Sequence, residues 1–399
     1  MDKVKRILMQ EIYDVAIVGG GPAGTYCAKC AAEMGLSVIL LEENETIGEP
    51  VHCGECLSKL CTLNYGIDLP LEAISKKVKG IRVVFPSGKD TYLDEEGYVL
   101  EKAKFEQYIA ETAERKGATM VLGAKVEGIK KGEDLWSLST KKGNYTSRIL
   151  VDASGSYSVV SNFLKLNESR FETVVGLQYE MEDVTTSGYI DFYLDIEAFP
   201  HGYFWIIPKS GERANVGLVT NEKTKAKAYL DSYIEKIGLD KKRKRKTFGG
   251  LIPSSGPLPK TYGERVMLIG DAAGFTSPLF EGGTHLAIAS AKYAAEVAAE
   301  AIKNGERSAE FFSKYEKIWR SRFPEYSALL KGKNALYRLT NNELNQVGDL
   351  FPQKVANINL AEKLAIGIKL TWKYPHLYNK GIISILRSFG YSRAEFFGW

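Results

Sequence analysis

Two Cys-x-x-Cys pairs near the start of the chain hold the residues best suited to chemistry. One is "CAKC", Cys27 to Cys30, and the other is "VHCGECLSK", which contains Cys53 and Cys56. Thiols at this spacing can bind zinc, form a redox dithiol or a disulfide, or pack as small apolar side chains. What the second loop does therefore depends on what the neighbouring chain binds.

The residues around the first pair predict a strand, a tight turn, a helix and a second strand. Apolar, β-rich runs occupy 13–18 and 37–41. Between them Gly19, Gly21 and Gly24 form G-x-G-x-x-G, which permits a sharp turn, lets backbone approach a pyrophosphate, and lets the helix pack closely on the strand. The helix N-terminus offers free N–H groups to that phosphate. This combination predicts a dinucleotide-binding fold.

Glu42 follows the second strand, at the spacing where a carboxylate accepts hydrogen bonds from ribose hydroxyls. An acid at this position argues against a 2′-phosphate, so FAD or NAD is expected rather than NADP. Cys27 and Cys30 lie on the intervening helix, where we expect them to pack. A zinc site would require this helix and the second cysteine loop to converge tetrahedrally, which the fold does not obviously permit.

Composition limits the remaining possibilities. The 399 residues are 44% hydrophobic and 26% charged with net charge +4, as in an ordinary globular protein of one large or two to three interlocked domains. The run "KKRKRK" at 241–246 lacks interleaved aromatic residues, so we expect a solvated loop and no nucleic-acid binding. No apolar stretch is long enough to span a membrane, and residues 1–15 do not resemble a signal peptide. A cytoplasmic protein is expected.

Two further segments identify the nucleotide by resemblance. "RVMLIGDAAG", containing Gly270 and Asp271, resembles the second FAD fingerprint of glutathione-reductase-like flavoproteins, in which the aspartate binds the ribityl chain. In the helix that follows, Gly282 and Gly283 would point backbone N–H groups towards the isoalloxazine, where a helix dipole stabilises the reduced ring. "RILVDASG", containing Asp152, resembles a strand and turn of flavin hydroxylases. These resemblances imply one extended FAD.

A third set of segments resembles the archaeal geranylgeranyl reductase family, within the p-hydroxybenzoate-hydroxylase-like flavoproteins. "IGEPVHCGECLSK" is similar to that family's Cys-Gly-Glu-Gly-Leu-Ser-Lys loop. "GYVLEKAKFEQYIAETAERKGA" (97–118) and "HGYFWIIPKSGERANVGL" (201–218) are similar to two later segments, and the likeness covers roughly 10–330 in the same order. It implies a discontinuous FAD-binding Rossmann domain (10–80, 97–172 and 258–305), an inserted antiparallel-sheet substrate domain (81–96 and 173–257) and a helical C-terminal region (306–399).

Three departures from the family pattern bear on chemistry. Cys56 replaces a glycine, so a redox dithiol of Cys53 and Cys56 stays an alternative. Lys102 replaces an arginine, which keeps the charge but loses the bidentate fork. Glu281 replaces a glycine beside the expected flavin, where a carboxylate would disfavour an anionic reduced ring.

The resemblance implies FAD-dependent reduction of isoprenoid C=C bonds, with hydride from the reduced flavin and a proton from an acid. Cys53 is the candidate for that acid or for positioning it, while packing on the ring is an equal alternative. His52 and Glu55 are expected to be exposed loop residues. Tyr203 and Trp205 alternate onto one face of a strand and would line a prenyl channel, unless they form only an aromatic sheet core.

The resemblance also implies a prenylated lipid substrate and ferredoxin or NAD(P)H as electron donor. The amphipathic helices after residue 310 would suit peripheral contact with a lipid surface. A flavin monooxygenase and a quinone-linked electron-transfer flavoprotein remain alternative functions. We assign no metal ligands, and we assign to the cofactor Gly19, Gly21, Ala23, Gly24, Glu42, Glu43, Cys53, Gly54, Lys102, Val126, Asp152, Gly155, Gly270, Asp271, Gly282, Gly283 and Thr284.

Overall fold

A sheet of eight strands carries the expected dinucleotide fold. The computed structural model describes residues 11–355 and 360–399, and so residues 1–10, for which no signal peptide was expected, lie outside it. The path through the sheet runs in the order β17 (Tyr262–Gly263), β18 (Val266–Leu268), β11 (Gly143–Asp152), β1 (Ile12–Val18), β2 (Val38–Leu41) and β8 (Thr119–Val121), while β9 (Val126–Lys131) and β10 (Trp136–Thr140) extend β11 as an antiparallel meander.

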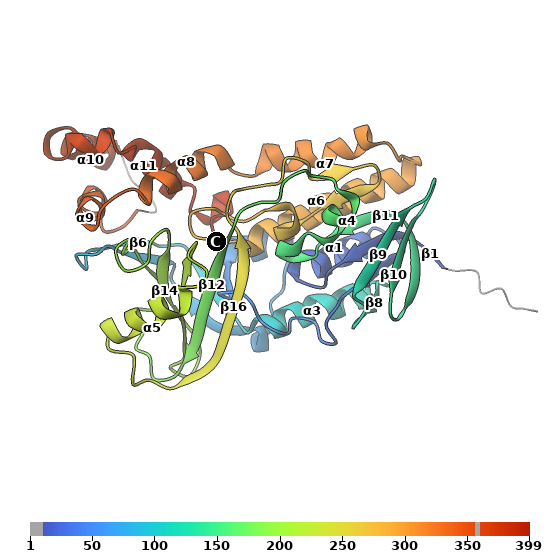
Figure 1. The fold of residues 1–399 in the computed structure, drawn as a ribbon, viewed down its shortest axis with the longest axis horizontal. Coiled ribbons are helices and arrows are strands. Elements are labelled where there is room, and N and C mark those ends of the chain that lie inside the picture. The colour runs from blue at the N-terminus through green and yellow to red at the C-terminus, as the bar shows by residue number, and fades with distance from the viewer. Residues whose placement is uncertain (1–10, 356–359) are drawn as a thin grey trace, which may run out of the picture.

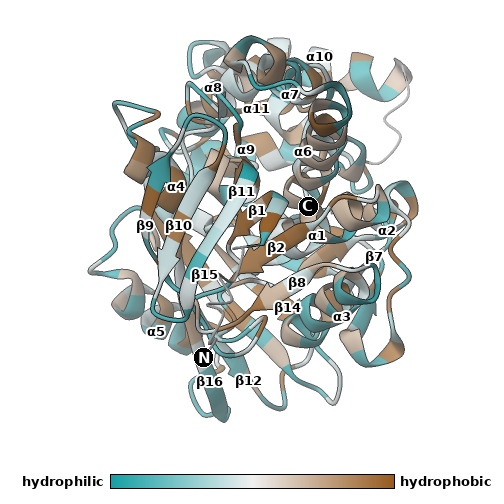
Figure 2. Cartoon of the chain, turned by 90° about the vertical axis from the view of Figure 1, so that its right-hand side faces the viewer, coloured by the Kyte–Doolittle hydropathy of each residue, from teal (hydrophilic) through white to brown (hydrophobic). Residues whose placement is uncertain are grey.

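The strands from β18 to β8 run parallel, with Val15 of β1 beside Ile149 of β11 and Val38 of β2. Parallel strands are covered on both faces, so they form near-continuous apolar runs. All four residues of β2 are buried, and β1 and β2 are coloured mostly as hydrophobic in Figure 2. The covering helices include α1 (Pro22–Glu33), α3 (Lys102–Arg115), α4 (Val159–Leu164), α6 (Thr284–Asn304) and α7 (Ala309–Arg322).

A second sheet, of seven strands, forms the other half of the molecule (Figure 1). Its order is β16 (Lys244–Pro253), β12 (Thr173–Met181), β15 (Ala214–Thr220), β14 (Tyr203–Pro208), β13 (Ile190–Tyr193), β5 (Ile81–Val84) and β6 (Asp90–Leu93), with α5 (Ala226–Lys236) packed on β12 and β15. The pairs are antiparallel as expected, except that β13 and β5 run parallel. The sheet is therefore mixed, because a strand from early in the chain joins its edge.

A small three-stranded sheet holds the second cysteine loop. The antiparallel strands are β3 (Cys56–Ser58), β7 (Gly97–Leu100) and β4 (Ile74–Val78), with α2 (Lys59–Tyr65) and the short helix η1 (Leu71–Ala73) in the connections. Because Cys56 pairs with Val99, the loop that precedes β3 is fixed at its C-terminal end. The loop therefore has a defined position beside the start of α3.

The C-terminal helices divide between two hydrophobic cores. Phe312, Tyr315 and Trp319 of α7 belong to the core of the eight-stranded sheet, whereas the later helices share the core of the seven-stranded sheet. These are α8 (Tyr326–Leu336), α9 (Asn341–Leu350), α10 (Leu360–Lys373) and α11 (Ile382–Gly390), with short helices η4 (Pro375–Tyr378) and η5 (Ala394–Phe396). Within the described ranges, no helix combines the length and apolar character needed to cross a membrane.

The last residues of the chain return to the centre of the molecule (Figure 1). Trp399 is buried and its Nε1 donates to Glu95 at 3.2 Å. A Cβ atom on Gly282 would lie 2.7 Å from the carbonyl oxygen of Gly398. The end of the chain thus packs against the turn before α6, beside the expected flavin.

The basic run at 241–246 is only partly the solvated loop that was expected. Lys244, Arg245 and Lys246 begin strand β16. Arg245 pairs with Glu180 at 3.4 Å and Lys244 with Asp231 at 2.9 Å. The expected loop was wrong for this half of the run, because these residues extend β16 along β12, but their side chains are exposed to solvent as expected.

Candidate active site

The glycine-rich turn joins β1 to α1 as the pattern predicts. Gly19 has φ of +108°, in the left-handed region that glycine favours. A Cβ atom on Gly24 would lie 1.9 Å from the Gly19 carbonyl oxygen, so the close approach of helix and strand excludes any side chain. No atom lies within 4 Å of a Cβ position on Gly21, which leaves space for a phosphate before the helix N-terminus.

Glu42 is fixed beside this turn. Its carboxylate accepts hydrogen bonds from the Gly20 backbone N at 2.5 Å and from the backbone N of Asn44 at 2.9 Å. Asn44 Nδ2 also donates to it at 2.8 Å. A carboxylate has about four acceptor positions, so one remains for a ribose hydroxyl. Glu43 is exposed and pairs with Lys125 at 3.0 Å, so the two adjacent acids occupy different environments.

The second fingerprint lies against the first. Ala23 of α1 is in close contact with Gly270, where a Cβ atom would lie 2.9 Å from the Ala23 Cβ. Asp271 accepts a hydrogen bond from Thr276, and burial raises the pKa of its carboxyl to about 6. A Cβ atom on Gly283 would lie 3.3 Å from Asp271 Oδ1, so the aspartate lies beside the start of α6.

Helix α6 begins at Thr284, and Gly283 caps it without any side-chain hydrogen bond. The first N–H groups of a helix have no partner inside the helix. Those of α6 are therefore positioned to bind a ligand near Gly282 and Gly283, and their contact with the flavin stays a prediction. The 21 residues of α6 align a dipole whose positive end lies at the same place.

Asp152, assigned to the cofactor by resemblance, uses its side chain within the protein. Its Oδ1 accepts hydrogen bonds from the backbone N and the hydroxyl of Ser154, and its Oδ2 accepts from the backbone N of Ser161. The fully buried carboxylate thereby shapes the turn that follows β11. Gly155 in this turn has φ of +66° and open space around its Cβ position, and Val126 is a buried residue at the start of β9.

Cys53 lies at the junction of the two large sheets. Its Sγ accepts a hydrogen bond from the Glu55 backbone N at 3.2 Å, and its carbonyl oxygen accepts from Gln178 Nε2 of β12 at 2.8 Å. Burial raises the pKa of the Cys53 thiol, and it raises that of Cys56 further. Both thiols are free. Gly54, between them, lies against Ile207 of β14.

Glu55 is the residue that sequence reasoning missed. It was expected to be exposed, but it is 2% exposed and has φ of +72°. Its carboxylate accepts hydrogen bonds from the Lys102 backbone N at 3.0 Å, from Lys209 Nζ at 2.7 Å and from Asn215 Nδ2 at 2.7 Å. Lys209 and Asn215 follow Glu55 by about 150 residues. Composition cannot reveal a pairing over such a separation. His52, by contrast, is exposed as expected.

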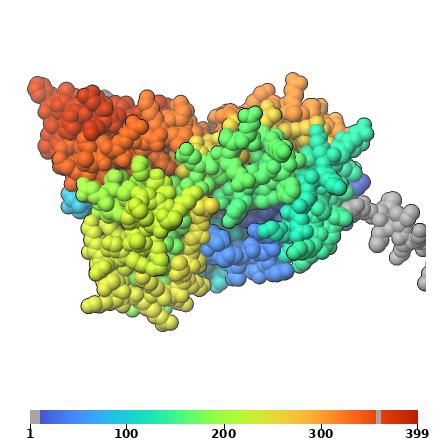
Figure 3. Space-filling model, in the orientation of Figure 1, coloured from blue at the N-terminus to red at the C-terminus, as the bar shows by residue number. Residues whose placement is uncertain are grey.

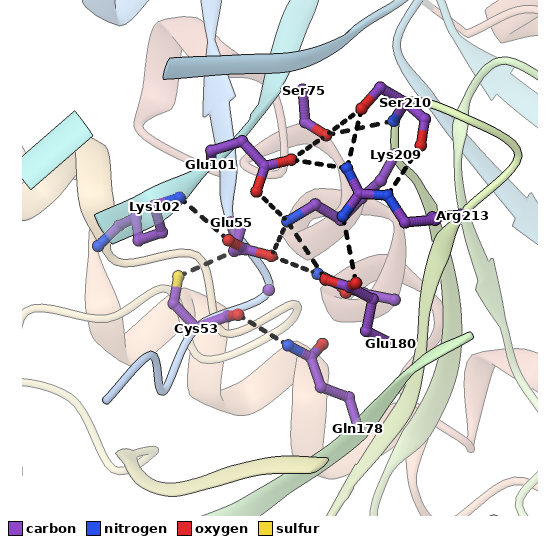
Figure 4. A network of polar contacts seen from close by, with 12 residues as sticks. Cys53, Glu55, Ser75, Glu101, Lys102, Gln178, Glu180, Lys209, Ser210 and Arg213 are labelled. Carbon is purple, nitrogen blue, oxygen red and sulfur yellow. Dashed lines mark hydrogen bonds and ion pairs between the residues drawn. The ribbon is translucent and has the colours of Figure 1, made fainter. Parts of the chain in front are cut away.

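Glu55 belongs to a buried network of charges that joins the cysteine loop to the seven-stranded sheet (Figure 4). Lys209 Nζ also lies 3.3 Å from Glu101 and 4.0 Å from Glu180. Arg213 bridges the same two acids, at 3.0 Å and 3.1 Å. In the sequence, this network is indicated by Lys209, which directly follows a strand whose six residues are all buried. A charge in such a place needs a partner of opposite charge.

Lys102 opens helix α3 beside the cysteine loop. Its side chain is buried and pairs with Glu106 one turn along the helix. The positive charge of Lys102 lowers the pKa of the Cys53 thiol and so opposes the effect of burial. The Lys102 backbone N donates to Glu55, two residues after Cys53, at 3.0 Å. The start of α3 and the cysteine loop are therefore adjacent, while the contact of Lys102 and Cys53 with the cofactor stays a prediction.

Tyr203 and Trp205 form part of a buried aromatic wall on β14. Their ring centroids are 5.9 Å apart, and Tyr203 contacts Phe192 of β13 and Phe280 from the turn before α6 at 5.1 Å and 5.5 Å. Trp205 Nε1 donates to Gln178 Oε1 at 3.0 Å. Because Gln178 also holds the Cys53 carbonyl oxygen, this glutamine, absent from the sequence assignments, ties the aromatic wall to the cysteine loop.

Cys27 and Cys30 are buried in α1, and burial raises the pKa of Cys30 to about 11. They pack as small apolar residues, as expected for this helix. In residues 11–355 and 360–399, no group of three or more His, Cys, Asp or Glu side chains is arranged to hold a metal ion.

A cavity of about 780 Å³ opens beside the cysteine loop, between residues 44–52 and residues 246–249 of β16. The two segments, blue and yellow, lie side by side on the face drawn in Figure 3. The cavity begins next to Glu42 and ends at His52. Together with the open space at Gly21 and the unpaired start of α6, it fits an extended dinucleotide that runs from Glu42 towards Cys53.

Two family models match the chain. The model described as "FAD dependent oxidoreductase" covers residues 14–161, and "Geranylgeranyl reductase catalytic domain" covers residues 172–250. The first contains the glycine turn, Glu42, Cys53 and Lys102. The second contains Gln178, Tyr203, Trp205 and Lys209. The two halves of the site therefore fall in two recognised families.

Curated relatives match over nearly the whole chain. A digeranylgeranylglycerophospholipid reductase of Methanocaldococcus jannaschii is 33% identical over 371 residues, which are 88% of this chain and 94% of the relative. The protein of the same name from Thermoplasma acidophilum is 33% identical over 391 residues, covering 92% and 98% of the two chains.

Solved structures agree. A geranylgeranyl bacteriochlorophyll reductase-like protein of Thermoplasma acidophilum superposes with a TM-score of 0.83 at 31% identity, covering 93% of this chain and 99% of that one. A flavin-dependent brominase shares the fold, with a TM-score of 0.71 at 19% identity over 94% and 100% of the chains. The cofactor is FAD, and the chain belongs to the digeranylgeranylglycerophospholipid reductase family of FAD-dependent oxidoreductases.

Proposed function

We propose that this protein reduces C=C bonds in the geranylgeranyl chains of digeranylgeranylglycerophospholipids or a related isoprenoid. The names of its relatives give the substrate class. The observation that carries the proposal is the junction at Gln178, which binds Trp205 of the aromatic wall and Cys53 of the cysteine loop at once. Gln178 thereby joins a buried aromatic cluster, of the apolar character that a prenyl chain requires, to the loop expected at the flavin.

Reduced FAD, when bound, supplies hydride from N5. Around it, the chain must hold a long apolar substrate and exclude water, which the buried rings of Tyr203 and Trp205 are suited to do. Cys53 remains protonated because burial raises its thiol pKa, so it packs or orients at the ring without charge. Lys102 and the α6 N-terminus provide positive potential for the reduced ring and the pyrophosphate.

The electron donor is proposed to be ferredoxin or NAD(P)H, as the family resemblance implies. We also propose peripheral contact with lipid. Leu364, Ile368 and Trp372 are exposed at successive turns of α10 and form an apolar stripe beside Lys373. An amphipathic helix of this kind can rest in the interface of a bilayer.

The test uses FAD-loaded protein under anaerobic conditions. The flavin is photoreduced, unsaturated archaeal lipid is added, and the product is analysed by mass spectrometry for stepwise gains of two hydrogens. Reoxidation of the flavin together with these gains supports the proposal. If prenyl chains stay unchanged while a quinone or an aromatic acid reoxidises the flavin, the assignment as a prenyl reductase is wrong.

A further inference from the structure

Glu281 occupies an unusual position for an acid. It lies in the turn before α6, next to Gly282 and Gly283, with φ of +48°. A side chain in this left-handed region costs conformational energy that glycine would avoid. The Glu281 side chain is only 3% exposed. An acid kept in a strained and buried position beside the cofactor site suggests a chemical role.

Only one oxygen of this carboxyl group is held. Lys333 Nζ, from α8, lies 3.3 Å from Oε1 and 3.5 Å from the Ser254 carbonyl oxygen. Oε2 is buried and has no well-aligned hydrogen-bond partner among the described residues, although the Tyr203 hydroxyl lies near enough to the carboxyl group to lower its pKa. A buried polar atom without a partner costs free energy. An orphaned oxygen therefore marks a place where a proton or a ligand completes the structure.

The surroundings of Glu281 raise its pKa above that of a free carboxyl group. The titratable groups facing it are Lys333 of α8, Tyr203 of β14 and Tyr337, which follows α8. Burial raises the pKa of Glu281, whereas the Lys333 charge lowers it. Burial raises the pKa values of Tyr203 and Tyr337, and a negative charge on Glu281 raises both further, so both hydroxyls remain protonated.

Glu281 also adjoins the proposed substrate surface. The preceding residue, Phe280, stacks on Phe192 of β13 at 4.8 Å and contacts the Tyr203 ring. Glu281 itself faces Tyr203, whose ring would contact the prenyl chain. The carboxyl group thus lies where the turn expected at the flavin meets the aromatic wall.

We propose that Glu281 is the acid that protonates the substrate double bond, an assignment that rests on the proposed reductase function. The O–H bond at Oε2 breaks and a C–H bond forms on one alkene carbon, while the other carbon receives hydride from the reduced cofactor. The Glu281 carboxylate that remains is stabilised by the Lys333 ammonium. A proton from water, or one that accompanies the electrons from the electron donor, then reprotonates Glu281 before the next double bond is reduced.

This assignment replaces Cys53 as the candidate acid. A thiol is intrinsically a weaker acid than a carboxyl group, and burial raises the Cys53 pKa further above neutrality. An acid that must protonate an unactivated alkene needs the lower pKa of the two. Cys53 then serves to pack or orient at the ring.

The experiment compares the FAD-loaded wild type with Glu281→Gln, using lipid reduction after photoreduction across a range of pH. General acid catalysis contributes about 10²- to 10⁴-fold, and we expect the variant to lose activity by that factor. In the wild type, activity should fall as pH rises through the Glu281 pKa, and this decline should be absent from the variant. Lys333→Met should shift the decline to higher pH, because the ammonium no longer lowers the Glu281 pKa.

A second measurement needs no turnover. The infrared spectrum of the FAD-loaded, substrate-free wild type should contain the C=O stretch of a buried protonated carboxyl group, and Glu281→Gln should lack it. Glu281→Gly, which relieves the strained φ, tests the same loss if the glutamine variant fails to fold. Asp195→Asn is the matched control, because Asp195 is also a buried acid paired with a lysine, Lys236 at 2.7 Å, outside this cluster.

The outcomes separate the two proposals. If the wild type reduces lipid and Glu281→Gln does so at the same rate with the same pH profile, the role of Glu281 is refuted while the reductase function stands. If the wild type reduces no prenyl chain, the reductase function falls and the role of Glu281 with it.

Discussion

Removal of the Glu55 carboxylate tests whether the buried charge network fixes the cysteine loop. In Glu55→Ala, Lys209 loses its 2.7 Å partner but retains Glu101 at 3.3 Å and Glu180 at 4.0 Å. Breaking a buried ion pair costs about 3–5 kcal/mol, and the remaining acids place this change at the lower end, about 3 kcal/mol. With an unfolding entropy of about 2.1 cal/mol/K per residue, the melting temperature should fall by about 4 °C.

The matched control is Glu96→Ala. Glu96 pairs with Lys59 at 2.6 Å, as short a distance as in the buried pair, but its side chain is 70% exposed. An exposed ion pair contributes little because water screens it. Thermal unfolding of FAD-free protein, followed by circular dichroism, should therefore show no measurable shift for this variant. Equal melting temperatures for the two variants would show that burial of the Glu55 network does not stabilise the fold.

Three further results are expected. Gly24→Ala should abolish flavin absorbance in the purified protein, because its Cβ would lie 1.9 Å from a backbone oxygen, whereas Gly367→Ala, with no atom within 4 Å, should retain it. FAD affinity, measured by quenching of flavin fluorescence, should rise as pH approaches about 6 from below and then level off. A ribityl hydroxyl that donates to Asp271 favours its ionised form, so binding lowers its pKa, and Asp271→Asn should remove the pH dependence. Gln178→Leu should leave the Cys53 carbonyl without its 2.8 Å donor and should lower the rate of lipid reduction with little change in FAD affinity; an unchanged rate would contradict the positioning role.

Local patterns predicted the dinucleotide half of the site well. The glycine turn, the acid after β2 and the turn before α6 each depend on neighbours within a few residues, and each occupies the position expected from its spacing. The basic run at 241–246 and the exposure of Glu55 were predicted wrongly for a common reason. Arg245 pairs with Glu180 and Glu55 pairs with Lys209, each partner lying on another element 65 or 154 positions away, and no local pattern encodes such pairs.

Short stretches of chain were enough to identify the nucleotide fold, the cofactor class and the family, because glycine spacing, apolar strands and the loop around Cys53 are local features. Which charged groups are buried together depends on the folded arrangement of distant segments. That arrangement brought Glu55 to Lys209 and Glu281 to Lys333, pairs separated by 154 and 52 positions. Burial changes the protonation of an acid through desolvation and through the charges packed around it, and both arise only when distant segments meet.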